Sequence, residues 1–214
     1  MLPAAVLEAE RLAARRGLVT LFSDVALFAR GGECIVVGGP NGSGKTTLLR
    51  MLAGLTQPVD GEIRWRQRAV RPFDPQLRDA VAFNGHHPAL KDELTAEENL
   101  ASWVALDDPA LPQRQVVEAL DWVALSRQGR LPVRVLSQGQ RRRIGLARLR
   151  LVARPLWILD EPLTALDVDG IALLRDLLER HLDAGGLCVA ASHQPLPVSR
   201  ARERTLTLRA VVAR

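Results

Sequence analysis

The 214-residue sequence contains no tyrosine, and its other aromatic residues are four phenylalanines and four tryptophans. It also has only two cysteines, Cys34 and Cys188, and each lies in an apolar run typical of a buried strand. We therefore expect buried, reduced thiols rather than a disulfide or a cysteine-based metal site. The tryptophans are expected in the core or at subdomain interfaces, and His181, late in an amphipathic helix, is expected at the surface.

Long hydrophobic runs are also missing. No stretch approaches the about 20 apolar residues that a membrane-spanning helix needs. The first 20 residues include Glu8, Glu10 and several arginines, and they lack the apolar core of a signal peptide. The net charge of +5 is spread along the chain without a basic tail, so it does not indicate a nucleic-acid surface. We expect a cytoplasmic protein that does not bind nucleic acid directly.

A glycine-rich loop is the strongest feature that is present. An apolar run, 34–37, leads into it and a helix-forming run, 47–53, leads out, which is the context that a G-x-x-x-x-G-K-T phosphate-binding loop requires. Glycines let backbone N–H groups approach phosphates, and the helix N-terminus adds partial positive charge. The expected nucleotide-binding residues are Gly39, Pro40, Asn41, Gly42, Ser43, Gly44, Lys45, Thr46 and Thr47.

Specific roles follow for the last part of this loop and for a second motif. Lys45 can reach the β- and γ-phosphates of ATP, and the Thr46 hydroxyl can bind Mg²⁺. Asp160 and Glu161 follow the continuously apolar run 155–159, which is typical of a strand buried on both faces. A carboxylate at such a strand end can hold Mg²⁺, so we assign Asp160 to the metal and Glu161 to the attacking water as general base.

A third motif, Leu136–Gln140, begins a long helix that runs to about residue 152. Free N–H groups at a helix start form an anion site. Ser137 adds a hydroxyl donor, and Gly139 allows close backbone approach. Small GTPases and kinases have no need of a second anion site, so this motif separates the chain from them. The three arginines that follow, 141–143, face either phosphate, an acidic partner or solvent.

The order of the segments indicates an α/β protein. Strands are expected at 5–13, 21–29, 34–37, 62–65, 80–83, 155–159 and 187–191, with a last edge strand at Leu206 and Leu208. Strands that alternate with helices imply a mostly parallel sheet. Thr95 and Glu98 form a capping box that starts a helix. From about 95 to 150 the signals are helical, with loops expected at 107–112 and 128–132. The amphipathic run 168–183 is a further helix, while 66–79 is polar and interrupted by proline.

With these motifs in this order, nearly the whole chain resembles the ATP-binding-cassette (ABC) ATPases. Thr164–Asp167 resembles the family's D-loop, and Ser192-His193 resembles its switch histidine. The resemblance implies a single ABC ATPase domain. Its P-loop NTPase core and small antiparallel β subdomain would comprise 1–87 and 153–214, and its helical subdomain would comprise about 88–152.

The family pairs two cassettes head to tail, so that each ATP lies between the phosphate loop of one and the signature of the other. By that resemblance, Ser137, Gly139 and Gln140 bind the partner's nucleotide, and His193 contacts the γ-phosphate within its own chain. Asp167 would link the two sites. Because the chain has one set of motifs, a second ATPase subunit is expected, most simply in a homodimer.

Three positions depart from the family pattern. Where an aromatic residue usually stacks on adenine, the chain has Arg16, whose guanidinium plane can stack on a base or lie free in a solvated turn. Where the family has a glutamine that reaches Mg²⁺, the chain has His86, followed by His87. A neutral imidazole can take that role, although the pair could instead bind haem or another metal, or simply face solvent. Gln138 replaces the first signature glycine.

Several segments narrow the resemblance to the haem-exporter ATPases of bacterial cytochrome c maturation. They are 62–65, 85–91, 93–100, 137–143 and 155–162. That resemblance implies ATP and Mg²⁺ as cofactors, integral membrane subunits as partners, and a peripheral location on the cytoplasmic face of the bacterial inner membrane. An exporter of another small solute or lipid remains an alternative, as does a soluble ABC ATPase that acts on nucleic acid or ribosomes.

Overall fold

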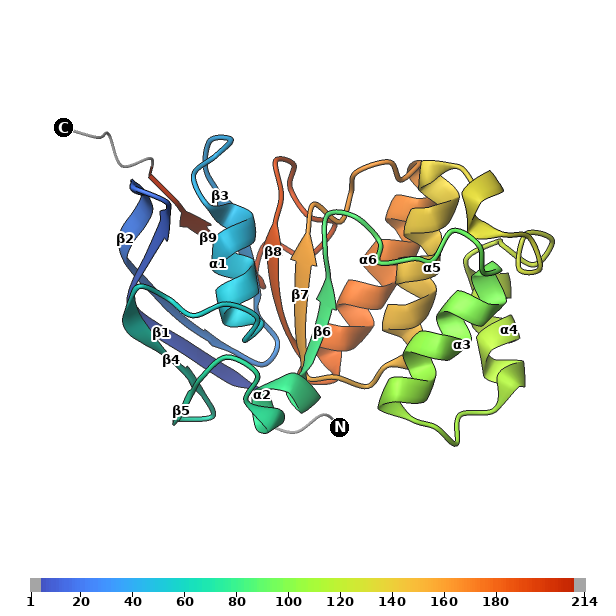
Figure 1. The fold of residues 1–214 in the computed structure, drawn as a ribbon, viewed down its shortest axis with the longest axis horizontal. Coiled ribbons are helices and arrows are strands. Elements are labelled where there is room, and N and C mark those ends of the chain that lie inside the picture. Colours follow the sequence, from blue (N-terminus) through green and yellow to red (C-terminus); the bar gives the residue numbers. More distant parts are fainter. Residues whose placement is uncertain (1–4, 210–214) are drawn as a thin grey trace. The chain divides into compact units, whose positions relative to one another are not determined.

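The structure is a computed structural model that describes residues 5–209, and Figure 1 shows its strands and helices. They are β1 (Val6–Arg16), β2 (Val19–Arg30), β3 (Cys34–Gly38), α1 (Lys45–Leu52), β4 (Asp60–Trp65), β5 (Arg68–Val70), α2 (Pro75–Ala80), β6 (Val81–Asn84), α3 (Ala96–Asp107), α4 (Gln113–Trp122), α5 (Gln138–Leu151), β7 (Leu156–Asp160), α6 (Val168–Asp183), β8 (Leu187–Ala191) and β9 (Glu203–Thr207). Within 5–209 they form two compact units.

The first unit comprises the described parts of Met1–His86 and Leu178–Arg214, together with Arg154–Pro162. It contains an antiparallel sheet of order β2-β1-β4-β5. The long hairpin β1–β2 has register shifts between Ala9 and Leu12 and again beyond Leu12. At these shifts Arg11 and Asp24 adopt positive φ angles of 50° and 55°, as expected where an extra residue bends a strand.

The second sheet of this unit has the order β6-β7-β8-β3-β9, and every neighbouring pair is parallel. The carboxyl ends of its strands therefore meet at one edge, which is where open α/β sheets bind ligands. The phosphate-binding loop follows β3, Asp160 ends β7, and Ser192-His193 follows β8. The order of the strands in the sheet thus places three predicted motifs on neighbouring strands.

Apolar side chains from both sheets and α1 form the core of the first unit. Helix α1 packs on β7 and β8, and it buries Leu48, Leu49 and Leu52 completely. Burial of one such leucine side chain contributes about 1.5–3 kcal/mol. This packing fixes the helix whose N-terminus carries the phosphate-binding loop.

The second unit comprises His87–Ala153 and Leu163–Leu177. Helices α3, α4 and α5 pack on one another, with Leu100, Val116, Leu120 and Ile144 buried among them. The predicted capping box is present: Glu98 N–H donates to Thr95 Oγ1 at 3.1 Å, and Thr95 N–H donates to Glu98 Oε2 at 2.8 Å. None of the helices within residues 5–209 is long and apolar enough to cross a membrane.

The structure places two elements in the polar, proline-interrupted residues 66–79, namely β5 and α2. Asp74 caps α2 by accepting N–H bonds from Gln76 and Leu77, a signal that an aspartate before a proline at the first helical position gives in the sequence.

One expectation is wrong: His181 is buried rather than at the surface. Burial of His181 has a local cause. Its ring stacks on Trp157 of β7 at 4.0 Å between centroids, and its Nε2 lies 3.1 Å from the carbonyl oxygen of Leu187. Gly186 leaves the space for the ring, since a Cβ there would lie 2.2 Å from His181 Cε1. Burial lowers the pKa of His181 to about 4, against the raising effect of the Leu187 carbonyl.

The two cysteines are free and buried, as expected. Cys34 of β3 and Cys188 of β8 are direct partners in the parallel register. The neighbouring Cys34 thiol and burial raise the pKa of Cys188. A thiol whose pKa is raised by apolar surroundings is unreactive, so the pair serves packing.

Candidate functional site

Backbone geometry makes the loop after β3 a cradle for phosphate. Gly39, Gly42 and Gly44 have φ angles of 141°, 80° and 94°, which residues with a Cβ rarely adopt. A Cβ on Gly39 would lie 2.7 Å from the Leu208 carbonyl oxygen, and one on Gly44 would lie 2.9 Å from Phe22 Cδ1. Glycine is therefore needed at Gly39 and Gly44 for both conformation and space, and at Gly42 for conformation alone.

Two side chains of the loop fit a phosphate ligand. The buried Lys45 ammonium donates to the carbonyl oxygens of Gly39 and Pro40 at 2.9 and 3.2 Å, so the cation is held against the loop. Ser43 is only 3% exposed, and its Oγ has no hydrogen-bond partner among the described residues. A buried, unpartnered hydroxyl is costly, and a phosphate oxygen would satisfy it.

The predicted metal-binding pair is in direct contact. Thr46 Oγ1 donates to Asp160 Oδ2 at 2.9 Å, which joins the start of α1 to the end of β7. Asp160 is 3% exposed. A hydroxyl and a buried carboxylate at this distance are oxygen ligands of the kind that Mg²⁺ prefers.

Glu161 and His193 also lie together, at the ends of β7 and β8. His193 Nε2 is 3.5 Å from Glu161 Oε1. Glu161 has a positive φ of 51°, and its N–H donates to the Ala191 carbonyl at 2.9 Å. A non-glycine residue in this conformation stores about 1–3 kcal/mol of strain and is typical of active sites. Ser192, before the histidine, accepts the Gln194 N–H and donates to the Gln194 carbonyl.

Arg16 and His86 lie in exposed segments of the first unit. Arg16 ends β1, at the exposed tip of the β1–β2 hairpin, while its neighbour Arg15 donates to Thr20 Oγ1 at 3.4 Å. His86 follows β6, on the sheet edge that also carries Asp160 at the end of the neighbouring strand β7. Its side chain is exposed.

The signature segment of the second unit starts α5 with a capping box that the sequence analysis missed. Gln140 N–H donates to Ser137 Oγ at 3.2 Å, and Ser137 N–H donates to Gln140 Oε1 at 2.9 Å. The signal was present, because Ser-x-x-Gln is a capping-box sequence. The Ser137 hydroxyl is exposed, so it keeps a hydrogen to donate to a ligand.

The signature segment lines a cavity of about 410 Å³ within the second unit. The predicted D-loop also lines this cavity, and its backbone lies against the signature segment: a Cβ on Gly139 would lie 2.9 Å from the Ala165 carbonyl oxygen. The cavity is lined by Ala124, Leu125, Ser137, Gly139, Gln140, Arg143, Ala165 and Asp167.

Arg141 and Arg143, which follow the signature, form ion pairs within the second unit. Arg143 contacts the Asp167 carboxylate, and Arg141 contacts Asp92 at 3.0 Å. Arg142 is buried. The sequence could not choose between phosphate, an acidic partner and solvent for Arg141 and Arg143, because their acidic partners are distant in the chain.

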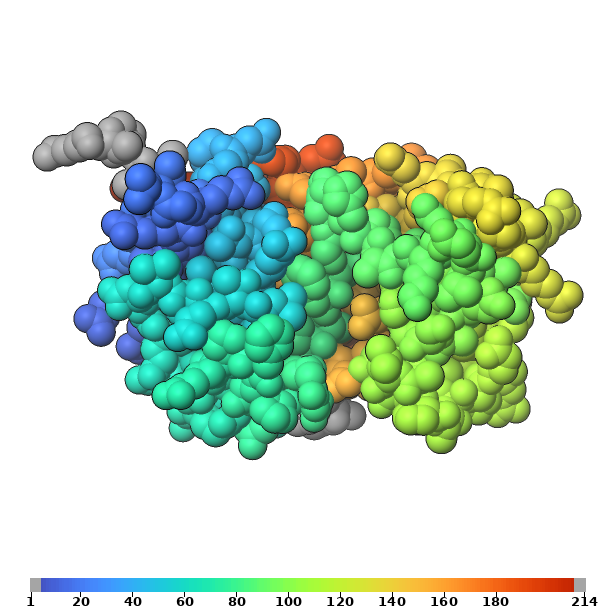
Figure 2. Space-filling view, viewed as in Figure 1, coloured from blue at the N-terminus to red at the C-terminus, as the bar shows by residue number. Residues whose placement is uncertain are grey.

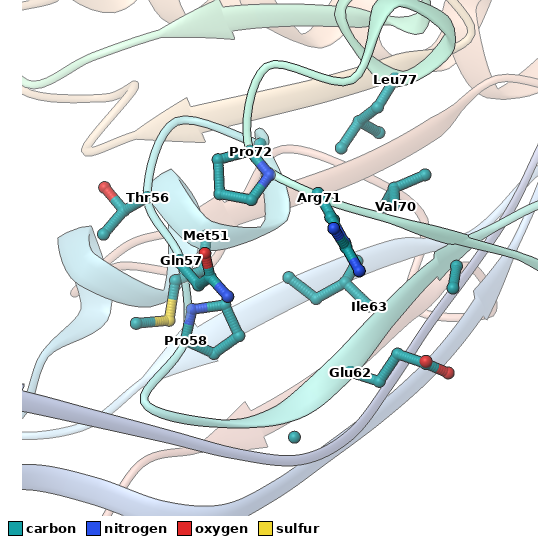
Figure 3. Close-up of a pocket in the computed structure, with 13 residues that line it drawn as sticks. Met51, Thr56, Gln57, Pro58, Glu62, Ile63, Val70, Arg71, Pro72 and Leu77 are labelled. Atoms are coloured by element: carbon teal, nitrogen blue, oxygen red, sulfur yellow. The ribbon is translucent and has the colours of Figure 1, made fainter.

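A different cavity, of about 250 Å³, lies at the opposite end of α1 from the phosphate-binding loop. Its walls come from the end of α1, from β4 and β5, and from the segment before α2, which form one continuous surface in Figure 2. Figure 3 shows Met51, Pro58, Ile63 and Pro72 around it. Because this cavity lies at the C-terminal end of α1 and Lys45 lies at the N-terminal end, we do not assign it to the nucleotide.

Parallel-sheet domains with a phosphate-binding loop after one strand and an aspartate ending a neighbouring strand are P-loop nucleotide-binding proteins, and the first unit has this architecture. Solved structures agree on the fold. A dimeric post-hydrolysis ATP-binding cassette, MJ0796 bound to ADP and Pi, has a TM-score of 0.82 at 24% identity and covers 94% of each chain. An ABC transporter ATP-binding protein from Pyrococcus furiosus has a TM-score of 0.77 at 23% identity, covering 95% of this chain and 97% of that one.

Sequence comparisons define the family. Residues 22–164 match the ABC transporter family. A relative from Nitrosomonas europaea named cytochrome c biogenesis ATP-binding export protein CcmA is 46% identical over 197 residues, 92% of each chain. A protein of the same name from Pseudomonas aeruginosa is 45% identical over 191 residues, 89% of this chain and 94% of the relative. The chain belongs to the ABC transporter family of ATP-binding proteins.

Proposed function

We propose that the chain is the ATP-hydrolysing subunit of a membrane ABC transporter complex that serves haem export or haem-chaperone release in cytochrome c maturation. The observation that carries this proposal is the 46% identity, over 92% of both chains, to a relative named cytochrome c biogenesis ATP-binding export protein. The whole chain acts as one ABC ATPase domain.

ATP is bound by the loop Gly39–Thr47, with Lys45 at the phosphates and Arg16 against the adenine. Thr46 and Asp160 are the residues that would hold magnesium, and His86 would join them from the next strand. Bound there, magnesium supplies positive charge to the phosphate oxygens. The Thr46–Asp160 contact of 2.9 Å supports this assignment.

Hydrolysis depends mainly on positioning and electrostatics. Glu161 accepts a proton from the attacking water, and His193 donates a hydrogen bond to the γ-phosphate. Their separation of 3.5 Å lets the carboxylate orient the imidazole. The strained backbone of Glu161 fixes the direction of its side chain.

Each complete site requires two chains. Ser137, Gly139 and Gln140 of one copy bind the nucleotide held by the phosphate loop of the other. The second subunit is a copy of this chain, and integral membrane subunits hold the pair on the cytoplasmic face of the bacterial inner membrane. The dimeric state of a solved cassette of the same fold, at a TM-score of 0.82, supports this arrangement.

Mutation of one residue from each half of the site tests the two-chain arrangement. Lys45→Ala should abolish hydrolysis and weaken ATP binding to the monomer. Ser137→Ala should lower hydrolysis by about 10–100-fold without changing ATP binding to the monomer, measured by calorimetry at low protein concentration. Equal loss of monomer binding in both variants would count against a site shared by two chains.

Purification from detergent-solubilised membranes tests the physiological role. We expect the chain to copurify with integral membrane subunits and haem to be retained by that complex. Membrane partners without haem would favour an exporter of another solute or lipid. Recovery of ribosomes or nucleic acid with no membrane protein would overturn the proposal.

A further inference from the structure

Arg143 of α5 contacts two segments that lie outside its own helix. Its Nη2 donates to both carboxylate oxygens of Asp167, at 2.7 and 2.8 Å, and its Nη1 donates to the Val123 carbonyl at 3.0 Å. The side chain is only 12% exposed. One guanidinium therefore joins the end of α4, the signature helix and the D-loop.

A second contact supports the same connection. Gly139 and Arg143 are four residues apart on α5, so they lie on one face of the helix. The backbone of Ala165 lies against Gly139, where a Cβ would be 2.9 Å from the Ala165 carbonyl oxygen. Ala165 itself has a positive φ of 62°. The D-loop is thus held to the signature helix at two successive turns, by close packing and by an ion pair.

Asp167 is fixed from its other side as well. Its Oδ1 accepts the Gly170 N–H at 2.9 Å in the first turn of α6. The hydrogen bond from Arg143 is the main influence that lowers the pKa of Asp167, with the Gly170 N–H adding to it. The carboxylate is ionised at neutral pH and connects α6 to α5.

We propose that Arg143 is a positioning residue, which holds the D-loop, Thr164–Asp167, against the signature segment so that both present one preformed face to the nucleotide bound by a second copy of the chain. This inference rests on the proposed two-chain ATPase function. Ser137 and Asp167 line the same cavity as Arg143. Loss of the guanidinium would therefore leave the D-loop and the signature segment free to move relative to each other. Arg143 itself acts through Asp167 and need not touch ATP.

The direct test is hydrogen exchange of the D-loop in the full-length chain. Arg143→Met removes the donors and keeps the length of the side chain, and Arg143→Lys keeps the charge but cannot make three bonds in the same fork geometry. We expect amide exchange over 163–171 to accelerate at least several-fold in both variants. Arg150→Met is the matched control, because Arg150 lies on the same helix and stacks on Trp122 at 4.8 Å, outside the cavity. Unchanged protection in Arg143→Met would overturn the proposal.

ATP turnover separates positioning from a merely structural ion pair. Arg143→Met should lower kcat by about 10–100-fold, since misplacement of groups in a site has effects of that size, while ATP affinity of the monomer and the denaturation midpoint of the second unit stay near those of Arg150→Met. Combined with Asp167→Asn, the two losses should be far from additive. Additive losses, or wild-type turnover in Arg143→Met, would overturn the inference. If the wild type itself does not hydrolyse ATP, the proposed function fails, and the exchange experiment still decides the role of Arg143.

Discussion

At the scale of single residues, costly conformations and burials occur among the residues of the proposed site. Glu161 has a positive φ, and the Ser43 hydroxyl is buried without a partner among residues 5–209. Both cost free energy in the folded chain, and both lie at the carboxyl edge of the parallel sheet. His181 is a different case, because its burial serves packing against Trp157 and not the site.

Burial of His181 predicts an acid-dependent loss of stability. Its folded pKa of about 4 lies below the ordinary value of 6.5. Above pH 6.5 the imidazole is neutral in both states; between the two values only the unfolded state binds the proton. Stability therefore falls as pH falls through this window, by about 2–3 kcal/mol at pH 4.5.

His181→Phe provides the comparison, because phenylalanine can still stack on Trp157 and does not titrate. The free energy of unfolding should be measured by urea titration at pH 7 and pH 4.5 for both proteins. The wild type should lose about 2–3 kcal/mol more than the variant between these values. Equal losses would show that His181 does not remain neutral in the folded chain.

At the scale of elements, capping boxes define where two helices of the second unit begin. Thr95 with Glu98 starts α3, and Ser137 with Gln140 starts α5. The capping box of α3 stabilises the start of that helix. The capping box of α5 also fixes the backbone of the signature segment, which is part of the proposed site.

Thr95→Ala should destabilise the second unit by about 1 kcal/mol, because the Glu98 N–H loses its acceptor at the helix start. Ser102→Ala is the control on the same helix, since its hydroxyl donates to the Glu98 carbonyl, which the helix already uses. It should change the free energy of unfolding by less than about 0.5 kcal/mol. Equal effects in denaturant titrations would contradict the capping role.

At the scale of the whole molecule, the two halves of the proposed site are carried by different compact units. The phosphate-binding loop belongs to the first unit, and the signature segment with the D-loop belongs to the second. In a dimer, each site would combine the first unit of one copy with the second unit of the other. Activity would then belong to the pair of chains.

Complementation tests that expectation. Lys45→Ala retains its signature segment, and Ser137→Ala retains its phosphate-binding loop, so a mixed dimer would contain one intact site. ATP turnover of an equimolar mixture should exceed the mean of the two variants measured alone by at least several-fold. Turnover equal to that mean would mean that each chain hydrolyses ATP by itself or that the chains do not exchange.

Local signals were sufficient for much of the fold. The ranges of α6 and β8 were predicted without error. The long amphipathic pattern of α6 indicated a helix, and the short, continuously apolar run of β8 indicated a buried strand. The strand expected at 5–13 extends to Arg16, and β2 begins at Val19. Those ends depend on pairing with a partner strand, which a local pattern does not specify.

By itself, the sequence predicted the phosphate-binding loop, the Asp160-Glu161 pair and the signature segment, because each motif is a short run whose chemistry depends on near neighbours. The order of these motifs also determined the ABC type of fold, through its resemblance to that family. Only the tertiary structure decided the strand order, the contact of Thr46 with Asp160, the burial of His181 and the pairing of Arg143 with Asp167. Those features join residues far apart in the chain, and packing of the whole unit sets which of many possible partners meet.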